Sequence, residues 1–272
     1  LAITGCMGRM GQQIIKSARS DKNFKIVALT ENRVINKKIS GIKPSLNTEQ
    51  SFKKANLIID FTVPKCTFEV LKIASKLKKK VVIGTTGFTK REENLIKKYS
   101  KKIPILKAGN MSLGVNLLMY LTEITSRSLG KDFLYKIYEV HHNKKKDYPS
   151  GTALMLGNGI AIGKNKKFSN MIGKKFLNKK NFPYSKKINF NSIRRGKVIG
   201  EHIVKFSSGK ELVTLNHMSF DRALYSEGAL TASKWLMKKK PGLYSMRDLL
   251  NFKWTKKRNL KLLREYWITH TL

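Results

Sequence analysis

The segment EVHHNKKKDYPSGTA, residues 139–153, combines two adjacent histidines, three lysines and a Pro-Ser-Gly-Thr turn. An imidazole titrates near neutral pH and can donate a proton, and Lys145 can neutralise a carboxylate. Pro149 precedes an expected helix start, where the backbone N–H groups of Gly151 and Thr152 can hold an anion. The segment therefore predicts proton transfer to an anionic substrate. The alternative is a polar surface loop followed by a capped helix.

His141 and His142 are neighbours, so in a strand their side chains point to opposite faces of the sheet. One imidazole can then face a substrate while the other holds a different group. We find no cysteine or carboxylate at ligand spacing from the pair, and a metal bound by both imidazoles is not expected. The sequence therefore predicts no metal site.

A glycine loop, GCMGRMG, places Gly5, Gly8 and Gly11 between an expected strand and an expected helix. Glycines let the backbone approach a pyrophosphate, and a helix N-terminus supplies free N–H groups. The spacing is G-x-x-G-x-x-G instead of G-x-G-x-x-G, so an ordinary tight turn is the alternative. Glu31 follows about twenty residues later, where an acid would hold the ribose hydroxyls of a dinucleotide.

Two further polar segments, GTTG (84–87) and AGNMS (108–112), lie at the carboxyl ends of later expected strands. In an open α/β sheet, the carboxyl ends of the strands border the ligand crevice. Turn chemistry alone would explain such residues, but three polar strand ends on one edge favour a dinucleotide site.

These motifs need an alternating scaffold, and the first half of the chain has one. Strands are expected at 1–4, 25–31, 56–62, 80–87 and 103–110, and helices at 12–19, at 64–77 and after a capping box from Thr89 to Glu92. Strands that alternate with helices indicate a parallel sheet covered on both faces. The predicted fold class is therefore α/β, with a Rossmann-like doubly wound domain at residues 1–112.

The pattern changes after Ser112, which is expected to cap a long helix that ends at Ser128. A second, α+β domain is predicted at 113–221. Its expected elements are a strand at 132–142, a helix opened by PSGTA, and a hairpin of 198–206 and 210–217, whereas 164–195 shows only a weak pattern. Helices are expected at 228–237 and 244–250, and the tail from Lys253 is expected to form a peripheral helix.

The net charge is +39 over 272 residues, with 56 Lys and Arg against 17 Asp and Glu. A basic stripe would suggest nucleic-acid binding, but the basic residues are mostly lysine and are spread along the whole chain. A lysine-rich surface without a nucleic-acid partner is the favoured interpretation, and its field would still attract small anions.

Cys6 and Cys66 form no disulfide framework, and no apolar run approaches the ~20 residues needed to cross a bilayer. We see no secretion leader, so a reducing cytoplasm and no membrane partner are expected. The short first strand without an initiator methionine suggests that a few residues precede Leu1.

The histidine segment resembles the signature E-x-H-H-x-x-K-x-D-x-P-S-G-T-A of the dihydrodipicolinate reductase family of lysine biosynthesis. IIDFT, VVIGTTGF, NMSLGVN, GEH and GLYSMRDLL also resemble that family, in order, to about Phe252. The resemblance implies an NADH- or NADPH-dependent oxidoreductase that reduces 4-hydroxy-tetrahydrodipicolinate, a cyclic dicarboxylate, with loss of water. It also implies a homotetramer built through the second domain, and a C-terminal segment, 222–272, that completes the first.

The resemblance assigns roles by position. His141 would donate the proton, Lys145 would assist catalysis and hold one carboxylate, His142 would contact substrate, and Gly151 and Thr152 would bind the other carboxylate. The implied cofactor-binding residues are Gly5, Cys6, Met7, Gly8, Arg9, Met10, Glu31, Gly84, Thr85, Thr86, Ala108, Gly109, Asn110 and Met111.

This chain departs from the family pattern after the ribose-binding acid. Asn32 follows Glu31 where many members have arginine, so Glu31 favours NADH, while Arg33, Lys37 or Lys38 could accept the 2′-phosphate of NADPH. Gly109 replaces a common proline or alanine.

Three other functions fit the sequence less well. A nucleotide-sensing regulator would need a helix-turn-helix or winged segment, and the sequence shows none. A semialdehyde dehydrogenase would need an activated cysteine. An enzyme that had lost its activity would not keep the histidine segment.

Overall fold

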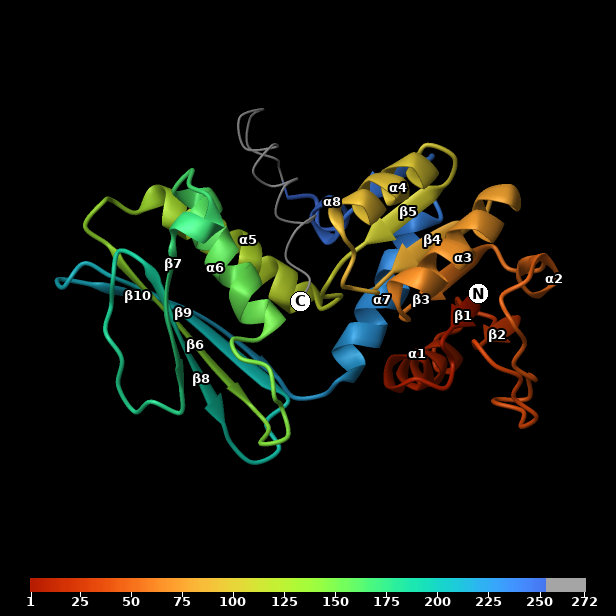
Figure 1. The fold of residues 1–272 in the computed structure, drawn as a ribbon, viewed down its shortest axis with the longest axis horizontal. Helices are drawn as coiled ribbons and strands as arrows, with labels where there is room; N and C mark the ends of the chain where they lie inside the picture. Colours follow the sequence, from red (N-terminus) through yellow and green to blue (C-terminus); the bar gives the residue numbers. More distant parts are fainter. Residues whose placement is uncertain (253–272) are drawn as a thin grey trace. The chain divides into compact units, whose positions relative to one another are not determined.

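A computed structural model describes residues 1–252, and these divide into two compact units (Figure 1). The first unit comprises Leu1–Leu113 and Ala223–Phe252, and the second comprises Gly114–Arg222. The peripheral helix predicted from Lys253, and the part of the predicted first domain after residue 252, lie outside the described residues.

The first unit is a six-stranded sheet between helices. Its strands are β1 (Ala2–Thr4), β2 (Ala28–Thr30), β3 (Leu57–Asp60), β4 (Lys80–Ile83), β5 (Pro104–Lys107) and β11 (Gly242–Tyr244). Its helices are α1 (Arg9–Arg19), α2 (Glu49–Phe52), α3 (Pro64–Lys76), α4 (Lys90–Ser100), α7 (Ala223–Leu236) and α8 (Met246–Leu249). The order is β11-β5-β4-β3-β1-β2 and every pair is parallel, which confirms the predicted Rossmann-like sheet.

Alternate side chains of this sheet fill two separate cores. Ile59, Val82 and Leu106 pack with α1 and α7, while Ile58 and Val81 pack on the opposite face with α3 and α4. The central strands are therefore apolar on both faces, as expected for a covered parallel sheet. The order reverses at β1, which has β2 on one side and β3 on the other, and this switch point opens the ligand crevice of such folds.

The second unit is a mixed five-stranded sheet. Its strands are β6 (Leu134–His141), β7 (Ile172–Leu177), β8 (Ile188–Arg194), β9 (Gly200–Ser207) and β10 (Leu212–Ser219), in the order β10-β9-β6-β8-β7. The helices α5 (Leu113–Ser128) and α6 (Gly151–Gly163), and a 3-10 turn at Phe168–Asn170, pack on one face (Figure 1). The central strand, β6, is antiparallel to β9 and parallel to β8.

Residues 164–195, where the sequence showed only a weak pattern, contain β7 and β8. The sequence pattern did not indicate β8, because two of its buried residues, Asn189 and Asn191, are polar. The Asn189 amide accepts the Lys174 N–H at 2.8 Å and donates to the Pro183 carbonyl at 3.0 Å. These amides satisfy neighbouring backbone groups and break the apolar alternation that identifies a strand.

Smaller differences concern the ends of elements. α1 begins at Arg9 instead of Gln12, and α7 begins at Ala223 instead of Gly228. β11 and α2 were not predicted, because three or four residues carry no readable period. The predicted capping box of α4 is present in full, from Thr89 to Glu92. Within residues 1–252, no helix is both long enough and apolar enough to cross a membrane.

Candidate active site

The glycine loop forms a tight turn between β1 and α1. Gly5 has φ +63°, its carbonyl accepts the Gly8 N–H at 3.0 Å, and the Cys6 N–H donates to the Thr30 carbonyl at 3.2 Å. A Cβ on Gly11 would lie 2.2 Å from the Gly5 oxygen, so only glycine lets the helix approach the loop. Gly8 caps α1 without a side-chain hydrogen bond, which leaves the helix N-terminus suited to an anion.

Glu31 lies directly after β2, beside this loop. Its carboxylate accepts the Met7 N–H at 3.0 Å and the Asn32 N–H at 3.1 Å. The structure therefore brings the predicted ribose-binding acid to the glycine loop. Arg9 is exposed, as are Arg33, Lys37 and Lys38 along the chain after Glu31, while Met10 is half-buried.

The segment after β4 passes close to β3. A Cβ on Gly84 would lie 2.2 Å from the Phe61 ring, so the backbone can pass only without a side chain. Thr85 turns its hydroxyl inward, where it accepts the Thr62 N–H at 2.8 Å, whereas Thr86 is exposed. Thr85 could therefore contact a cofactor only through its backbone.

Buried Asp60 is the last residue of β3, and its carboxylate accepts hydrogen bonds from four threonine hydroxyls. Thr4 and Thr62 donate to Oδ1 at 2.7 and 2.6 Å, Thr85 donates to Oδ2 at 3.2 Å, and Thr67 donates to Oδ2 as well. Burial raises the pKa of this carboxyl, and the hydroxyls oppose that shift. Asp60 therefore joins the ends of β1, β3 and β4, a function that the sequence did not suggest.

The segment after β5 is mostly internal. Ala108 is buried and donates its N–H to the Ile83 carbonyl at 3.1 Å, and Gly109 is exposed. Asn110 is buried and its side chain accepts the Ser112 N–H at 2.9 Å, while Met111 lies in the core. Of this predicted group, Gly109 alone is exposed.

Neither cysteine is activated as a nucleophile. Burial, followed by the charge of Glu31, raises the pKa of the Cys6 thiol to about 11. Burial also raises the pKa of the Cys66 thiol, whose sulfur accepts a hydrogen bond from Asn47 at 3.2 Å. A thiol that stays protonated at neutral pH argues against thioester chemistry.

In the second unit, β6 ends at the buried His141, and the half-buried His142 follows in the turn. The Lys145 N–H donates to the His142 carbonyl at 3.1 Å, and the Lys145 ammonium lies 2.7 Å from Asp147. Arg194 donates to the carbonyls of Lys145 and Asp147 at 3.1 and 2.7 Å. Arg194, which the sequence did not single out, thus holds the loop that carries both predicted substrate-binding side chains.

The surroundings of His142 are electropositive. Partial burial lowers the pKa of this imidazole, and the nearby charges of Arg222, His141, Lys145 and Arg194 lower it further. A neutral imidazole among cations favours an anionic ligand. The start of α6 lies on the same chain segment, with Ser150 as N-cap accepting the Ala153 N–H at 3.2 Å, an exposed Gly151 and a half-buried Thr152.

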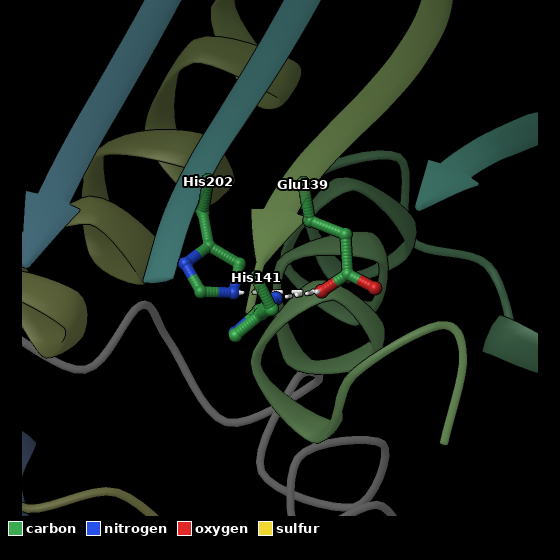
Figure 2. A group of neighbouring side chains, drawn as sticks. All are labelled: Glu139, His141 and His202. Carbon is green, nitrogen blue, oxygen red and sulfur yellow. Dashed lines mark ion pairs between the residues drawn. The ribbon is translucent and has the colours of Figure 1, made fainter. Parts of the chain in front are cut away.

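Three buried side chains meet at the end of β6: Glu139, His141 and His202 (Figure 2). Glu139 Oε2 lies 3.3 Å from His141 Nδ1 and 3.7 Å from His202 Nε2. Their ligand atoms lie within 4.8 Å of one another and could hold a divalent ion after rearrangement. The same geometry is satisfied by an ion pair between the carboxylate and an imidazolium.

Glu139 and His202 were not predicted as site residues, although Glu139 lies in the histidine segment and His202 in the GEH motif. Glu139 precedes His141 by two residues, so strand alternation alone places them on one face. His202 could not be found in this way, because its proximity depends on the pairing of β6 with β9, where it lies opposite Glu139.

Comparison with known proteins gives consistent results over the described chain. Models of the N-terminal and C-terminal parts of dihydrodipicolinate reductase match residues 1–111 and 114–250. The chain is 74% identical to the 4-hydroxy-tetrahydrodipicolinate reductase of Pelagibacter ubique over 93% of its length and 98% of the relative. The enzyme of that name from Buchnera aphidicola subsp. Schizaphis graminum is 39% identical over 93% of this chain and 97% of its own.

A solved structure agrees with these matches. It is a dipicolinate-bound dihydrodipicolinate reductase from Paenisporosarcina sp. TG-14, with a TM-score of 0.76 and 25% identity over 93% of this chain and 98% of that one.

Proposed function

The chain belongs to the dihydrodipicolinate reductase family, and on that premise we propose that it reduces 4-hydroxy-tetrahydrodipicolinate to tetrahydrodipicolinate, with loss of water, at the expense of NADH or NADPH. This step belongs to the diaminopimelate route of lysine biosynthesis. The observation that carries the proposal is the 74% identity to a named reductase over 93% of the chain. A cytoplasmic location follows as part of the proposal, since the reaction consumes a nicotinamide cofactor of that compartment.

The residues present in the first unit fit a dinucleotide. The close approaches at Gly11 and Gly84 leave no room for a side chain, as a backbone cradle requires. The pyrophosphate would be held by the loop from Gly5 to Met10 and the ribose by Glu31, with further contacts from Gly84–Thr86 and Ala108–Met111. When bound, NAD(P)H supplies the hydride.

The second unit would hold and protonate the substrate. His141 would donate the proton, and the positive charges around His142 would favour the dianionic ring. Lys145 would exchange its pairing with Asp147 for one substrate carboxylate, while the N–H groups of Gly151 and Thr152 would bind the other. General acid catalysis of this kind contributes ~10²–10⁴-fold.

The proposed assembly is a homotetramer built through the second unit. In the described residues, α5 and α6 cover one face of the mixed sheet and no helix covers the other (Figure 1). The edge strand β10 also exposes Leu212 by 52% and Met218 by 44% of their surfaces, and Phe220 beyond it by 83%. Burial of such apolar surface by a second copy would stabilise the assembly. Light scattering of the purified protein would test the mass.

The reaction is tested by following NADH and NADPH oxidation with freshly made product of the preceding synthase. His141→Gln is expected to lower turnover at least ~100-fold with near-normal NADH affinity, because the variant lacks the proton donor. Lys145→Ala should behave likewise. Lys146→Ala, an exposed lysine of the same loop, is the matched control and should remain active. Normal turnover of either of the first two variants would contradict its assigned role.

A further inference from the structure

We propose that Glu139 is the positioning residue of this reaction: it orients His141 so that Nε2 carries the transferred proton, and it couples this imidazole to the start of α6. The inference rests on the proposed function. It goes further by assigning a proton-transfer atom and a residue that acts through another.

The first contact is between Glu139 and His141 on one face of β6. Glu139 Oε2 and His141 Nδ1 are 3.3 Å apart, both atoms are buried, and neither has a hydrogen-bond partner elsewhere in residues 1–252. A carboxylate in this position draws the imidazole proton to Nδ1. Nε2 is then the nitrogen left to exchange a proton with substrate.

The other oxygen of the Glu139 carboxylate, Oε1, contacts residues beside the proposed substrate-binding groups. Oε1 accepts the Ser150 N–H at 2.9 Å and the Ser192 hydroxyl at 2.6 Å, and Arg194 Nη2 lies 3.6 Å away. Ser150 is the N-cap of α6 and directly precedes Gly151. One carboxylate therefore fixes the position of the proton donor relative to the proposed carboxylate-binding N–H groups.

His202 supports this pair from β9. Its ring meets His141 edge to face at 5.0 Å between centroids, and its Nε2 lies 3.2 Å from the Ser150 hydroxyl. Burial, and then the charge of His141, lower its pKa to about 3, so it is neutral at working pH. Ser150 Oγ at 3.2 Å and Glu139 Oε2 at 3.7 Å both lie on the Nε2 side of this ring, and its Nδ1 is buried with no hydrogen-bond partner in residues 1–252. A hydrogen on Nε2 therefore faces two oxygens, whereas a hydrogen on Nδ1 would be a buried, unpaired donor.

The charge arrangement makes Glu139 the anion that stabilises the protonated donor. Within residues 1–252, the titratable or charged groups that face the carboxylate are His141 from β6, His202 from β9 and Arg194 from β8, while α6 contributes Ser150 and no charge. His217 on β10 and Lys145 act on His202 from further away. With His202 neutral and Arg194 at Oε1, Oε2 is left to pair with the His141 imidazolium.

Glu139→Gln tests the inference without changing the shape of the side chain. Its amide oxygen would keep the two donors at Oε1, so the NH₂ group would face His141 Nδ1 and force the hydrogen of the neutral ring onto Nε2. The wrong tautomer and the lost charge should lower kcat by about 10²-fold, with the KM of the substrate within about threefold and NADH affinity unchanged. The basic limb of the kcat–pH profile should shift to lower pH.

Two further measurements separate positioning from a structural role. Ser192→Ala removes one donor at Oε1 but keeps the charge, so its kcat–pH profile should not move. Nitrogen-15 spectra of the imidazoles in the wild-type protein should show neutral His141 with hydrogen on Nδ1, a test that needs no variant. A wild-type profile for Glu139→Gln, or hydrogen on Nε2 in the wild type, would overturn the inference. Failure of the proposed function would instead appear as a wild-type protein that does not turn over the substrate.

Discussion

Gly11→Ala tests whether the glycine loop is a close-approach site. Gly11 lies in the first turn of α1, and a Cβ there would lie 2.2 Å from the Gly5 carbonyl oxygen and 2.9 Å from Cys6 Cα. Both obstructing atoms are backbone, so no side chain can rotate away. The strain can be relieved only if the helix and the loop separate by about 1 Å, since non-bonded heavy atoms pack at about 3.5 Å.

Two contributions of opposite sign decide the outcome. Alanine in place of glycine in a helix stabilises it by up to about 1 kcal/mol. Forcing a methyl group into a packed site costs about 1–3 kcal/mol. Because the clash is with backbone, we expect the steric contribution to be larger, with a net loss of about 1–2 kcal/mol. For a chain of this size that corresponds to a fall in Tm of roughly 2–8 °C.

The displacement should weaken cofactor binding as well as the fold. A loop moved by about 1 Å no longer matches a pyrophosphate, so we expect the Kd for NADH to rise at least ~10-fold, which is about 1.4 kcal/mol. Fluorescence titration with NADH and thermal unfolding measure the two effects. Gly130→Ala, whose added methyl meets nothing within 4 Å, is the control. A Gly11→Ala protein with unchanged Kd and a higher Tm would refute the steric argument.

Two buried carboxylates give further predictions. Burial alone would raise the pKa of Glu139, but the facing imidazole and two hydrogen bonds lower its folded-state pKa to about 2, from an ordinary 4.5. The resulting contribution to folding stability, about 3 kcal/mol, is present above pH 4.5 and is lost as the pH falls toward 2. Urea unfolding across that window should show a smaller pH dependence for Glu139→Gln than for the wild type, and equal slopes would contradict the assignment. Asp60→Asn removes an acceptor from at least two threonine hydroxyls, each costing about 1–3 kcal/mol, and this should exceed the gain from no longer burying a charge. We expect Tm to fall by roughly 5 °C, whereas a rise would show that the desolvation of Asp60 is the larger contribution.

Local patterns predicted most of the first unit. The continuous apolar strands before Asp60 and after Lys80, Pro64 at the start of α3 and the Thr89 capping box each specify an element within a few residues. The order of the strands could not be read in this way, and β11 was missed because its three residues gain their conformation from pairing with β5. Tertiary pairing, not local preference, determines such an element.

The site residues also divide into those that local patterns indicate and those that depend on strand pairing. The resemblance supplied His141 and Lys145, and strand alternation could have supplied Glu139. Arg194 and His202 come from strands distant in the sequence, and only the pairing of β6 with β8 and β9 brings them to the histidine segment. Asp60 was hidden for a different reason: a lone acid at the end of a strand looks like a solvated charge until four hydroxyls are seen around it.

The register of the mixed sheet is therefore what creates the chemistry of the second unit. Ser192, Glu139 and His202 lie side by side across β8, β6 and β9, and one pair earlier along the same face Ile137 lies opposite Val204. A slip of one residue between β6 and β9 would turn the carboxylate and the imidazole to opposite faces, and would expose one of the two apolar side chains. The apolar contacts that hold the register thus also hold the proton donor against its carboxylate. Because a buried carboxylate without partners is strongly unfavourable, the polar row is tolerated only in the correct register, and core packing and catalytic geometry depend on the same strand pairing.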